Sequence, residues 1–268
     1  MSRGDRVVAS GNLSHSMREN YQQGVSEYYG KVGSVYRNPH FPGIRRCMFQ
    51  WLNRWWQMES TSLSMQDEIL MFDMACGRSA TIAFREWWEL GRKLHESLKR
   101  ANYGGNALAE PPRKKTQTMP PPIPPEYPQP KIVAADPFTS VAYYERTSLP
   151  SSRLSFKDIS EGSLPPLQPE TSAPESSAVA YPTIDMVICS FALHLVETPS
   201  ELFSLLWELS SKTRWLVVLA PHKKPEIKEG WGWCKWDIES WTSRRMTDNI
   251  PEILHERVHC RVYRSLNV

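Results

Sequence analysis

The chain has 268 residues, of which 40% are hydrophobic and 23% charged, and its formal net charge at pH 7 is +3. This composition is typical of one globular domain with a buried core, and it excludes a chain that is disordered throughout. A charge so close to balance does not by itself indicate nucleic acid or an acidic membrane surface as a partner.

The five cysteines form no C-x-x-C pair and have no metal-ligand spacing to histidine, so we expect a reduced compartment and no metal site. No stretch reaches the roughly 20 apolar residues that a membrane-spanning helix needs, and the first 20 residues contain no apolar signal segment. We therefore expect no membrane partner and a cytoplasmic or nuclear location.

Residues 1–20 are polar and without periodicity, and we predict a flexible N-terminal arm followed by a single domain over residues 21–268. After Pro39 and Pro42, a helix is predicted from Gly43 onward. Its apolar residues recur at helical spacing and are interpreted as a stripe that faces the core: Ile44, Met48, Trp51, Leu52 and Trp55.

Residues 69–72 are a short apolar run that predicts a strand, and an amphipathic segment from Thr81 to Arg100 predicts a helix after a small-residue turn. Residues 103–130 are dense in proline and predict a proline-rich insertion that is mobile and dispensable for ligand binding. PxxP segments are also what SH3 and WW domains bind, so such a domain is a candidate partner.

The second half of the chain again alternates strands and helices. Residues 161–181 are rich in Pro, Ser and Glu and are predicted to be a flexible loop. Residues 198–201 (TPSE) form a capping box that starts a helix. Strands are predicted over residues 131–136, 153–158, 183–190, 213–220 and, as a closing strand, 253–266, with a further helix over 141–147.

This order predicts an α/β fold with a doubly wound, mainly parallel sheet that carries helices on both faces. In such sheets ligands bind outside the carboxyl ends of the strands. The turn after residue 72 brings a helix N-terminus to such a site, and Asp136 suits the hydroxyls of a ribose. Asp158 with Ile159, after the third strand, suits an adenine.

Four of these segments resemble the motifs of the class I S-adenosyl-L-methionine-dependent methyltransferases, which have a Rossmann-like fold. FDMACGRSA is similar to their first motif, AADP to the second, FKDIS to the third and DMVICSFALHLVE to the fourth. The resemblance runs from Tyr28 to about His222 and implies S-adenosyl-L-methionine as cofactor. The cofactor-binding residues that it implies are Tyr28, Tyr36, Arg37, Asp73, Ala75, Cys76, Gly77, Asp136, Pro137, Asp158, Ile159, Cys189, Ser190 and Phe191.

Two departures from the family pattern leave room for an inactive methyltransferase-like interaction module, because Ala75 and Ser79 stand where the family commonly has glycine. CSFA stands where members that methylate planar amines have NPPY, which disfavours a DNA base or a glutamine amide as acceptor. His194 is the candidate catalytic base, with a backbone hydrogen bond as the alternative role.

The acceptor side is predicted in a loop over residues 222–241, which interleaves basic and aromatic residues, as nucleotide-binding surfaces do. The candidate substrate-binding residues are His222, Lys223, Lys224, Trp231 and Trp233. An RNA or ribonucleoprotein and a small aromatic molecule are both open as acceptors, and so is a structural role in which these tryptophans cover the edge of the sheet.

Overall fold

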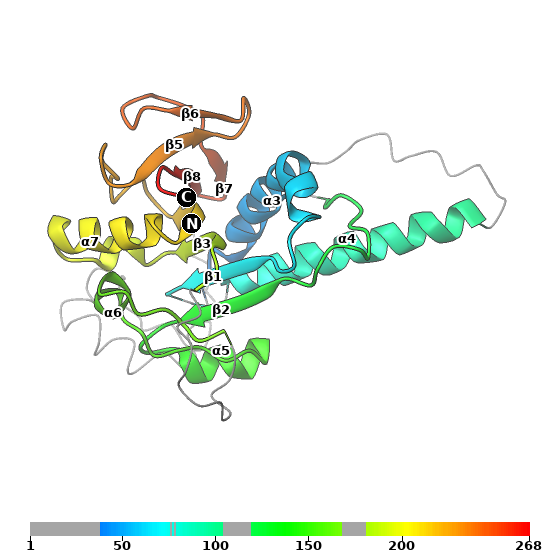
Figure 1. The fold of residues 1–268 in the computed structure, drawn as a ribbon, viewed down its shortest axis with the longest axis horizontal. Helices are drawn as coiled ribbons and strands as arrows, with labels where there is room; N and C mark the ends of the chain where they lie inside the picture. Colours follow the sequence, from blue (N-terminus) through cyan, green and yellow to red (C-terminus); the bar gives the residue numbers. More distant parts are fainter. Residues whose placement is uncertain (1–37, 76, 78, 104–118, 168–180) are drawn as a thin grey trace, which may run out of the picture.

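A mixed sheet of eight strands organises the part of the chain that the computed structural model describes, which is residues 38–75, 77, 79–103, 119–167 and 181–268 (Figure 1). Strands β1 (Leu70–Met74), β2 (Lys131–Ala135), β3 (Ile184–Ser190) and β4 (Thr213–Ala220) are parallel, in the order β2-β1-β3-β4. The predicted residues Tyr28, Tyr36, Arg37 and Cys76 and the predicted arm over 1–20 lie outside the described residues.

The other half of the sheet is antiparallel, so the expectation of a mainly parallel sheet holds only for β1 to β4. Strand β8 (Val258–Ser265) pairs antiparallel with β4, β5 (Trp233–Asp237) with β8, β6 (Thr242–Arg244) with β5, and β7 (Ile253–His255) with β8. Short turns join β5 to β6 and β7 to β8, and short turns permit only antiparallel pairing. The predicted closing strand is therefore a hairpin.

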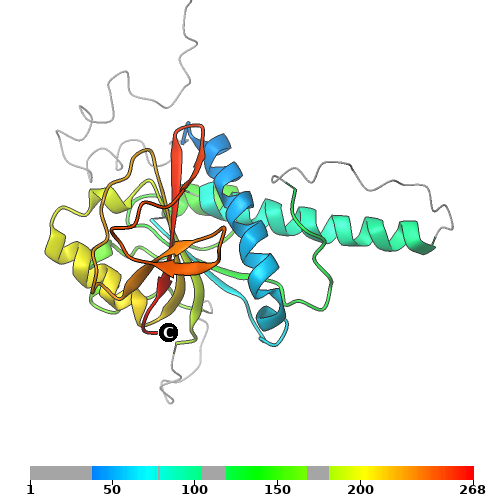
Figure 2. The ribbon, with the colours of Figure 1, turned by 90° about the horizontal axis from the view of Figure 1, so that it is seen from above.

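Helices cover both faces of the sheet, as predicted, because alternate residues of each strand point to opposite faces. Trp215, Val217 and Leu219 of β4 pack with α3 (Phe41–Leu63) and α4 (Ser79–Tyr103). Leu216 and Val218 pack with α6 (Phe156–Ser160) and α7 (Pro199–Ser210) on the other face. Figure 2 shows α3 between the β7–β8 hairpin and α4. The predicted apolar stripe of α3 is buried throughout.

The strand predicted over residues 153–158 is wrong, because this segment enters the short helix α6 instead. The side chain of Ser155 accepts a hydrogen bond from the backbone N–H of Asp158 (3.2 Å), and the Asp158 carboxylate accepts one from the N–H of Ser155 (2.8 Å). This reciprocal pair is a capping box, which starts a helix. Only Ser152 bridges to Ala135 of β2. The helix predicted over 141–147 is α5 (Ser140–Thr147).

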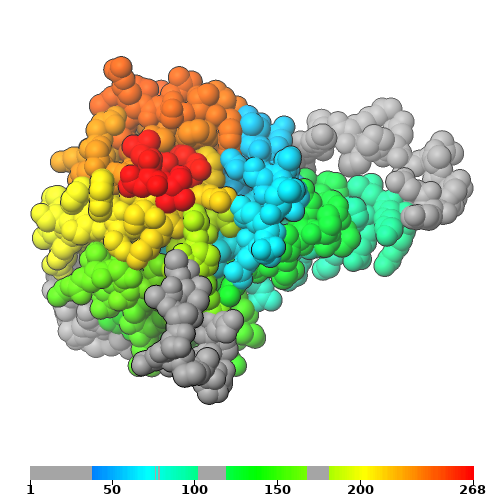
Figure 3. Space-filling view, in the orientation of Figure 1, coloured from blue at the N-terminus to red at the C-terminus, as the bar shows by residue number. Residues whose placement is uncertain are grey.

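Residues 119–130, here named the proline strap, are packed against the molecule, so the predicted mobility is wrong for this part of the insertion. Ile123 is fully buried, and its N–H donates to the carbonyl of Gly91 (3.0 Å). The Tyr127 ring lies 4.5 Å from that of Trp56. Figure 3 shows the strap in green against α4. Proline prevents regular hydrogen bonding but does not prevent packing against aromatic rings.

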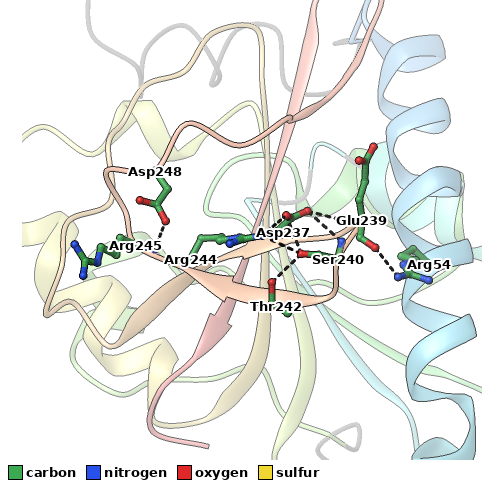
Figure 4. Close-up of polar contacts among 8 residues, drawn as sticks. All are labelled: Arg54, Asp237, Glu239, Ser240, Thr242, Arg244, Arg245 and Asp248. Carbon is green, nitrogen blue, oxygen red and sulfur yellow. Dashed lines mark hydrogen bonds and ion pairs between the residues drawn. The ribbon is translucent and has the colours of Figure 1, made fainter.

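The hairpin of β5 and β6 replaces the second half of the loop predicted over 222–241 and is held by polar contacts at its turn (Figure 4). Asp237 accepts hydrogen bonds from Ser240 Oγ (2.8 Å) and Arg244 (3.2 Å). Arg54 of α3 donates to the carbonyls of Ile238 (2.8 Å) and Glu239 (2.7 Å). The hairpin is therefore fastened to α3.

Candidate functional site

A cavity of about 360 Å³ opens at the carboxyl ends of β1, β2 and β3. Its wall comes from the turn after β1, the loop after β2, α6, the end of β3 and the start of α7. The residues that line it are Asn38, Ala75, Gly77, Ser79, Asp136, Pro137, Phe138, Thr139, Leu154, Ser155, Phe156, Lys157, Ile159, Ser160, Ser190, Phe191, Ala192, Leu195, Val196, Glu197 and Glu201. The strand-end rule thus predicted its location correctly.

The turn after β1 supplies the base of the wall. Ala75 has a φ of 58°, in the left-handed region that favours glycine, and the N–H of Gly77 donates to the Ala75 carbonyl (2.8 Å). A non-glycine residue in this conformation costs about 1–2 kcal/mol. The turn ends at Ser79, where α4 begins, so the N-terminus of this helix lies at the cavity, as predicted.

Asp73 lies beneath this turn and not on the cavity wall, which differs from its predicted place beside the methionine moiety. Its carboxylate accepts from the hydroxyl (2.6 Å) and the N–H (3.2 Å) of Thr81, and the hydroxyl of Thr81 is 2.9 Å from that of Tyr143. Burial raises the pKa of Asp73 to about 7. Its other oxygen, Oδ1, has no partner among the described residues. These contacts indicate that Asp73 stabilises the turn.

Asp136 and Pro137 follow β2 and line the cavity. The Asp136 Oδ1 atom accepts from the backbone N–H groups of Phe138 (2.7 Å) and Thr139 (2.8 Å), which fixes the orientation of the carboxylate. Burial raises the pKa of this carboxyl, and the two N–H donors oppose that rise.

In α6, Ile159 lines the cavity but Asp158 does not. The Asp158 carboxylate is occupied by the N–H and hydroxyl of Ser155 (2.8 and 2.6 Å), which lower its pKa. Its carboxylate therefore serves as a helix cap in this structure, not as the adenine contact that the resemblance implied.

At the end of β3, Ser190 and Phe191 line the cavity. Ser190 is 8% exposed, and its hydroxyl has no partner among the described residues. Phe191 has a φ of 60° and stacks on His40 with 5.1 Å between ring centroids. Cys189 is instead fully buried in the core, where burial raises the pKa of its thiol to about 12, so its side chain is an apolar filler.

His194, the predicted catalytic base, does not line the cavity, although Leu195 next to it in the chain does; its ring meets that of His222 edge-on, with 5.4 Å between ring centroids. Burial, and next the neighbouring His222, lower the pKa of His194. Its buried Nδ1 atom has no partner among the described residues, so the predicted alternative of a backbone hydrogen bond at Nδ1 is not seen there.

In the loop after β4, some of the predicted substrate residues are exposed and others are buried. His222, Lys223 and Lys224 are exposed, and Arg261 donates to the carbonyls of Lys223 (2.7 Å) and Lys224 (3.3 Å). Trp231 is half-buried at the surface. Two residues later, Trp233 is fully buried and its indole N–H donates to the carbonyl of Leu206 (2.8 Å), so it cannot contact a substrate in this structure.

Several residues of the cavity wall were not predicted from the sequence. Asn38 and Phe138 line the cavity although no motif included them, and Glu197 and Glu201 line it although they were not named as site residues, Glu197 as the last residue of the fourth motif and Glu201 as part of the capping box. The α6 wall had a readable signal, because Ser155 and Asp158 have the spacing of a capping box. Within the described ranges, no cluster of three His, Cys, Asp or Glu side chains suits a metal ion, and no helix is both long and apolar enough to span a membrane.

Comparison with known proteins gives a relative in sequence and weak likenesses in structure. No model of a known protein family matches the chain. A Schizosaccharomyces pombe protein named "Uncharacterized protein C17A5.05c" is 41% identical over 260 residues, which are 96% of this chain and 95% of that protein.

Two solved structures resemble the fold only distantly. The magnesium protoporphyrin IX methyltransferase ChlM of Synechocystis PCC 6803, crystallised with bound SAM, aligns over 94% of this chain and 97% of its own, with a TM-score of 0.41 and 11% identity. A structure described as "Conversion of a Disulfide Bond into a Thioacetal Group during Echinomycin Biosynthesis" covers 90% of both chains, with a TM-score of 0.35 and 12% identity. Likenesses this weak carry no functional argument, which depends on the cavity itself.

Proposed function

The chain belongs to the family of the S. pombe protein C17A5.05c, and we propose that it is an S-adenosyl-L-methionine-dependent methyltransferase. The observation that carries the proposal is the single cavity in which four separate segments meet. Each of these segments resembles one cofactor motif of the class I methyltransferases, and each contributes to the cavity wall or to the turn beneath it.

The wall residues fit the cofactor on three observations. Asp136 presents an oriented, buried carboxylate that suits the two hydroxyls of a ribose. Ile159, Leu154 and Phe138 offer apolar surface for an adenine ring. The hydroxyl of Ser190, on the cavity wall, is buried without a partner among the described residues, so it is available to a bound ligand.

The roles of the chain's own residues follow from these places. The N-terminus of α4 at Ser79 would bind the cofactor's carboxylate, because helix N-termini attract anions. Asp136 would fix the ribose, and Ser190 and Phe191 would line the reacting end. The bound cofactor would supply a methyl group on a sulfonium, and transfer then needs an aligned acceptor and exclusion of water. Tyr28, Tyr36 and Arg37, which precede the wall residue Asn38, stay predicted cofactor residues.

His194 would take up the proton that the acceptor loses. Its lowered pKa keeps the imidazole neutral near pH 7, and a neutral imidazole has a nitrogen that accepts a proton.

Calorimetric titration of the full chain with S-adenosyl-L-methionine tests the proposal directly. We expect saturable binding with one site per chain. An absence of binding at millimolar cofactor would refute the enzyme and favour the alternative in which the fold serves as an inactive interaction module.

The structure gives opposing indications about the acceptor. Glu197 and Glu201 on the cavity wall repel a polyanion and favour a small neutral or cationic molecule. Lys223, Lys224 and Lys228 are exposed on the neighbouring loop, and Lys228 lies 6.0 Å from the Trp231 ring, which favours RNA as the second candidate.

Salt dependence distinguishes the two acceptors. If RNA binds this loop, its affinity should fall with salt at a slope of about −0.7 per phosphate contact for a single strand. The double change Lys223→Ala, Lys224→Ala should then flatten the slope, while S-adenosyl-L-methionine affinity stays unchanged because neither lysine lines the cavity. Absence of RNA binding by the unmodified chain at low salt would exclude RNA and leave the small molecule.

A further inference from the structure

We propose that the proline strap is an internal polyproline ligand of the α3–α4 groove and that its docking positions Asp136 for the cofactor. The proposal rests on the proposed function for its cofactor part alone. Its structural part, that the strap holds β2 in place, stands on contacts within the chain.

The groove has the features with which proteins bind proline-rich segments, namely aromatic rings and donors aimed at backbone carbonyls. Arg92 donates to the carbonyls of Pro124 and Tyr127, and its guanidinium lies 5.1 Å from the Trp88 ring. The Trp88 indole N–H donates to the side chain of Gln129 (3.2 Å). Proline has no N–H group to donate, and the carbonyls of Pro124 and Tyr127 are hydrogen-bonded by Arg92 of α4 instead.

Both helices of the groove contribute. Asn53 of α3 donates to the carbonyl of Met119 (2.9 Å) and accepts from the indole of Trp87 on α4 (2.7 Å). Gly91 lets the strap approach the helix backbone, because an added Cβ would lie 2.6 Å from Ile123 Cδ1 and 2.8 Å from the Pro121 carbonyl oxygen. The strap therefore lies in a groove to which both α3 and α4 contribute contacts.

The strap leads without interruption into β2, and Asp136 directly follows the last residue of β2. β2 is at the edge of the sheet, where it pairs fully with β1 on one side. On its other side, among the described residues, the bridge between Ala135 and Ser152 holds it: the Asp136 N–H donates to the Ser152 carbonyl and the Ser152 N–H donates to the Ala134 carbonyl, both at 2.9 Å. At the amino end of β2 the Lys131 N–H donates to the Ile69 carbonyl (2.8 Å), and the strap that precedes Lys131 adds a second anchor to this five-residue edge strand.

The same contacts bear on the predicted SH3- or WW-type partner. The prolines at 121, 122, 124 and 125 form the PxxP pattern, and Ile123 among them is fully buried against α4. A domain that binds proline-rich segments would have to displace the strap from the α3–α4 groove. By linkage, its binding and cofactor binding would then weaken each other.

The experiment uses Gly91→Ala in the full chain, with hydrogen exchange of the β2 amides and S-adenosyl-L-methionine affinity as readouts. Alanine favours a helix more than glycine does, so any loss of order must come from the displaced strap. We expect faster exchange in β2 and about tenfold weaker cofactor binding, the effect of misaligning one charge-assisted hydrogen bond. Arg92→Met, which keeps the side-chain stem and removes both donors, should act in the same direction if Gly91→Ala does not fold.

Val258→Ala is the matched control, because it removes buried methyl groups on β8, at the far side of β4 from β2. It should lower overall stability without selective loss of β2 protection. Unchanged β2 exchange in both strap variants would overturn the proposal, and faster β2 exchange with unchanged affinity would overturn the positioning of Asp136. If the unmodified chain binds no cofactor, the proposed function fails, while β2 exchange still decides whether the strap anchors the strand.

Discussion

Replacement of Asp136 by alanine is expected to weaken S-adenosyl-L-methionine binding by roughly 10- to 100-fold. The side chain is 8% exposed, lines the cavity and is held by two backbone N–H groups, so it is oriented before any ligand arrives. Hydrogen bonds from ribose hydroxyls to a carboxylate contribute about 1.5–3 kcal/mol, which converts to this range. Calorimetric titration measures the change.

The pH dependence of binding adds a second signature for Asp136. Burial raises the pKa of its carboxyl, and the hydroxyls of a ribose donate to the deprotonated form. Affinity should therefore fall on acidification at a higher pH than an exposed aspartate would give, and this fall should be absent in Asp136→Ala.

Asp158→Asn is the matched control for Asp136. An asparagine oxygen still accepts the hydrogen bonds from Ser155 that start α6, so the helix is kept while the charge is lost. We expect unchanged affinity because Asp158 does not line the cavity. An equal loss in both variants would show that the carboxylate of Asp158 turns toward the adenine when the cofactor binds. An unchanged affinity in Asp136→Ala would contradict the assignment of Asp136.

The parts of the fold that could be predicted are those in which local pattern and burial agree. The apolar runs of β1, β3 and β4 are buried between two layers of helices, so their strand signal does not compete with another. The stripe on α3 and the capping box at Thr198 likewise coincide with the observed helices. These local signals correctly predicted that the cavity lies at the carboxyl ends of the strands.

The predictions fail where the role of a residue depends on which residue it contacts in the fold. At residues 153–158, the apolar pattern predicts a strand, but the capping-box spacing of Ser155 and Asp158 starts a helix there instead. In the strap, proline density correctly excluded helix and strand, but packing depended on Gly91 and Trp88 in a distant helix, which no local pattern reveals. The role of the loop predicted over residues 222–241 could not be read from local pattern for the same reason.

Trp231 and Trp233 show how two similar residues acquire opposite roles. Gly232, between them, has a φ of 83°, and an added Cβ there would overlap the side chain of Ser210. The backbone thus turns tightly against the end of α7. Trp233 enters the core as the first residue of β5, whereas Trp231 stays at the surface, 5.9 Å from the Phe203 ring.

These positions predict effects of very different size for two alanine substitutions made two residues apart. Trp233→Ala should lower the free energy of unfolding by about 3–5 kcal/mol, because it leaves a large cavity and removes the donor to the Leu206 carbonyl. Trp231→Ala should lower it by only about 1 kcal/mol, the scale of a partly exposed aromatic pair. Guanidinium unfolding followed by circular dichroism measures both. A small effect of Trp233→Ala together with lost acceptor binding would restore Trp233 as a substrate residue, whereas loss of acceptor binding in Trp231→Ala alone, with the fold intact, would place the acceptor on the surface beside Lys228.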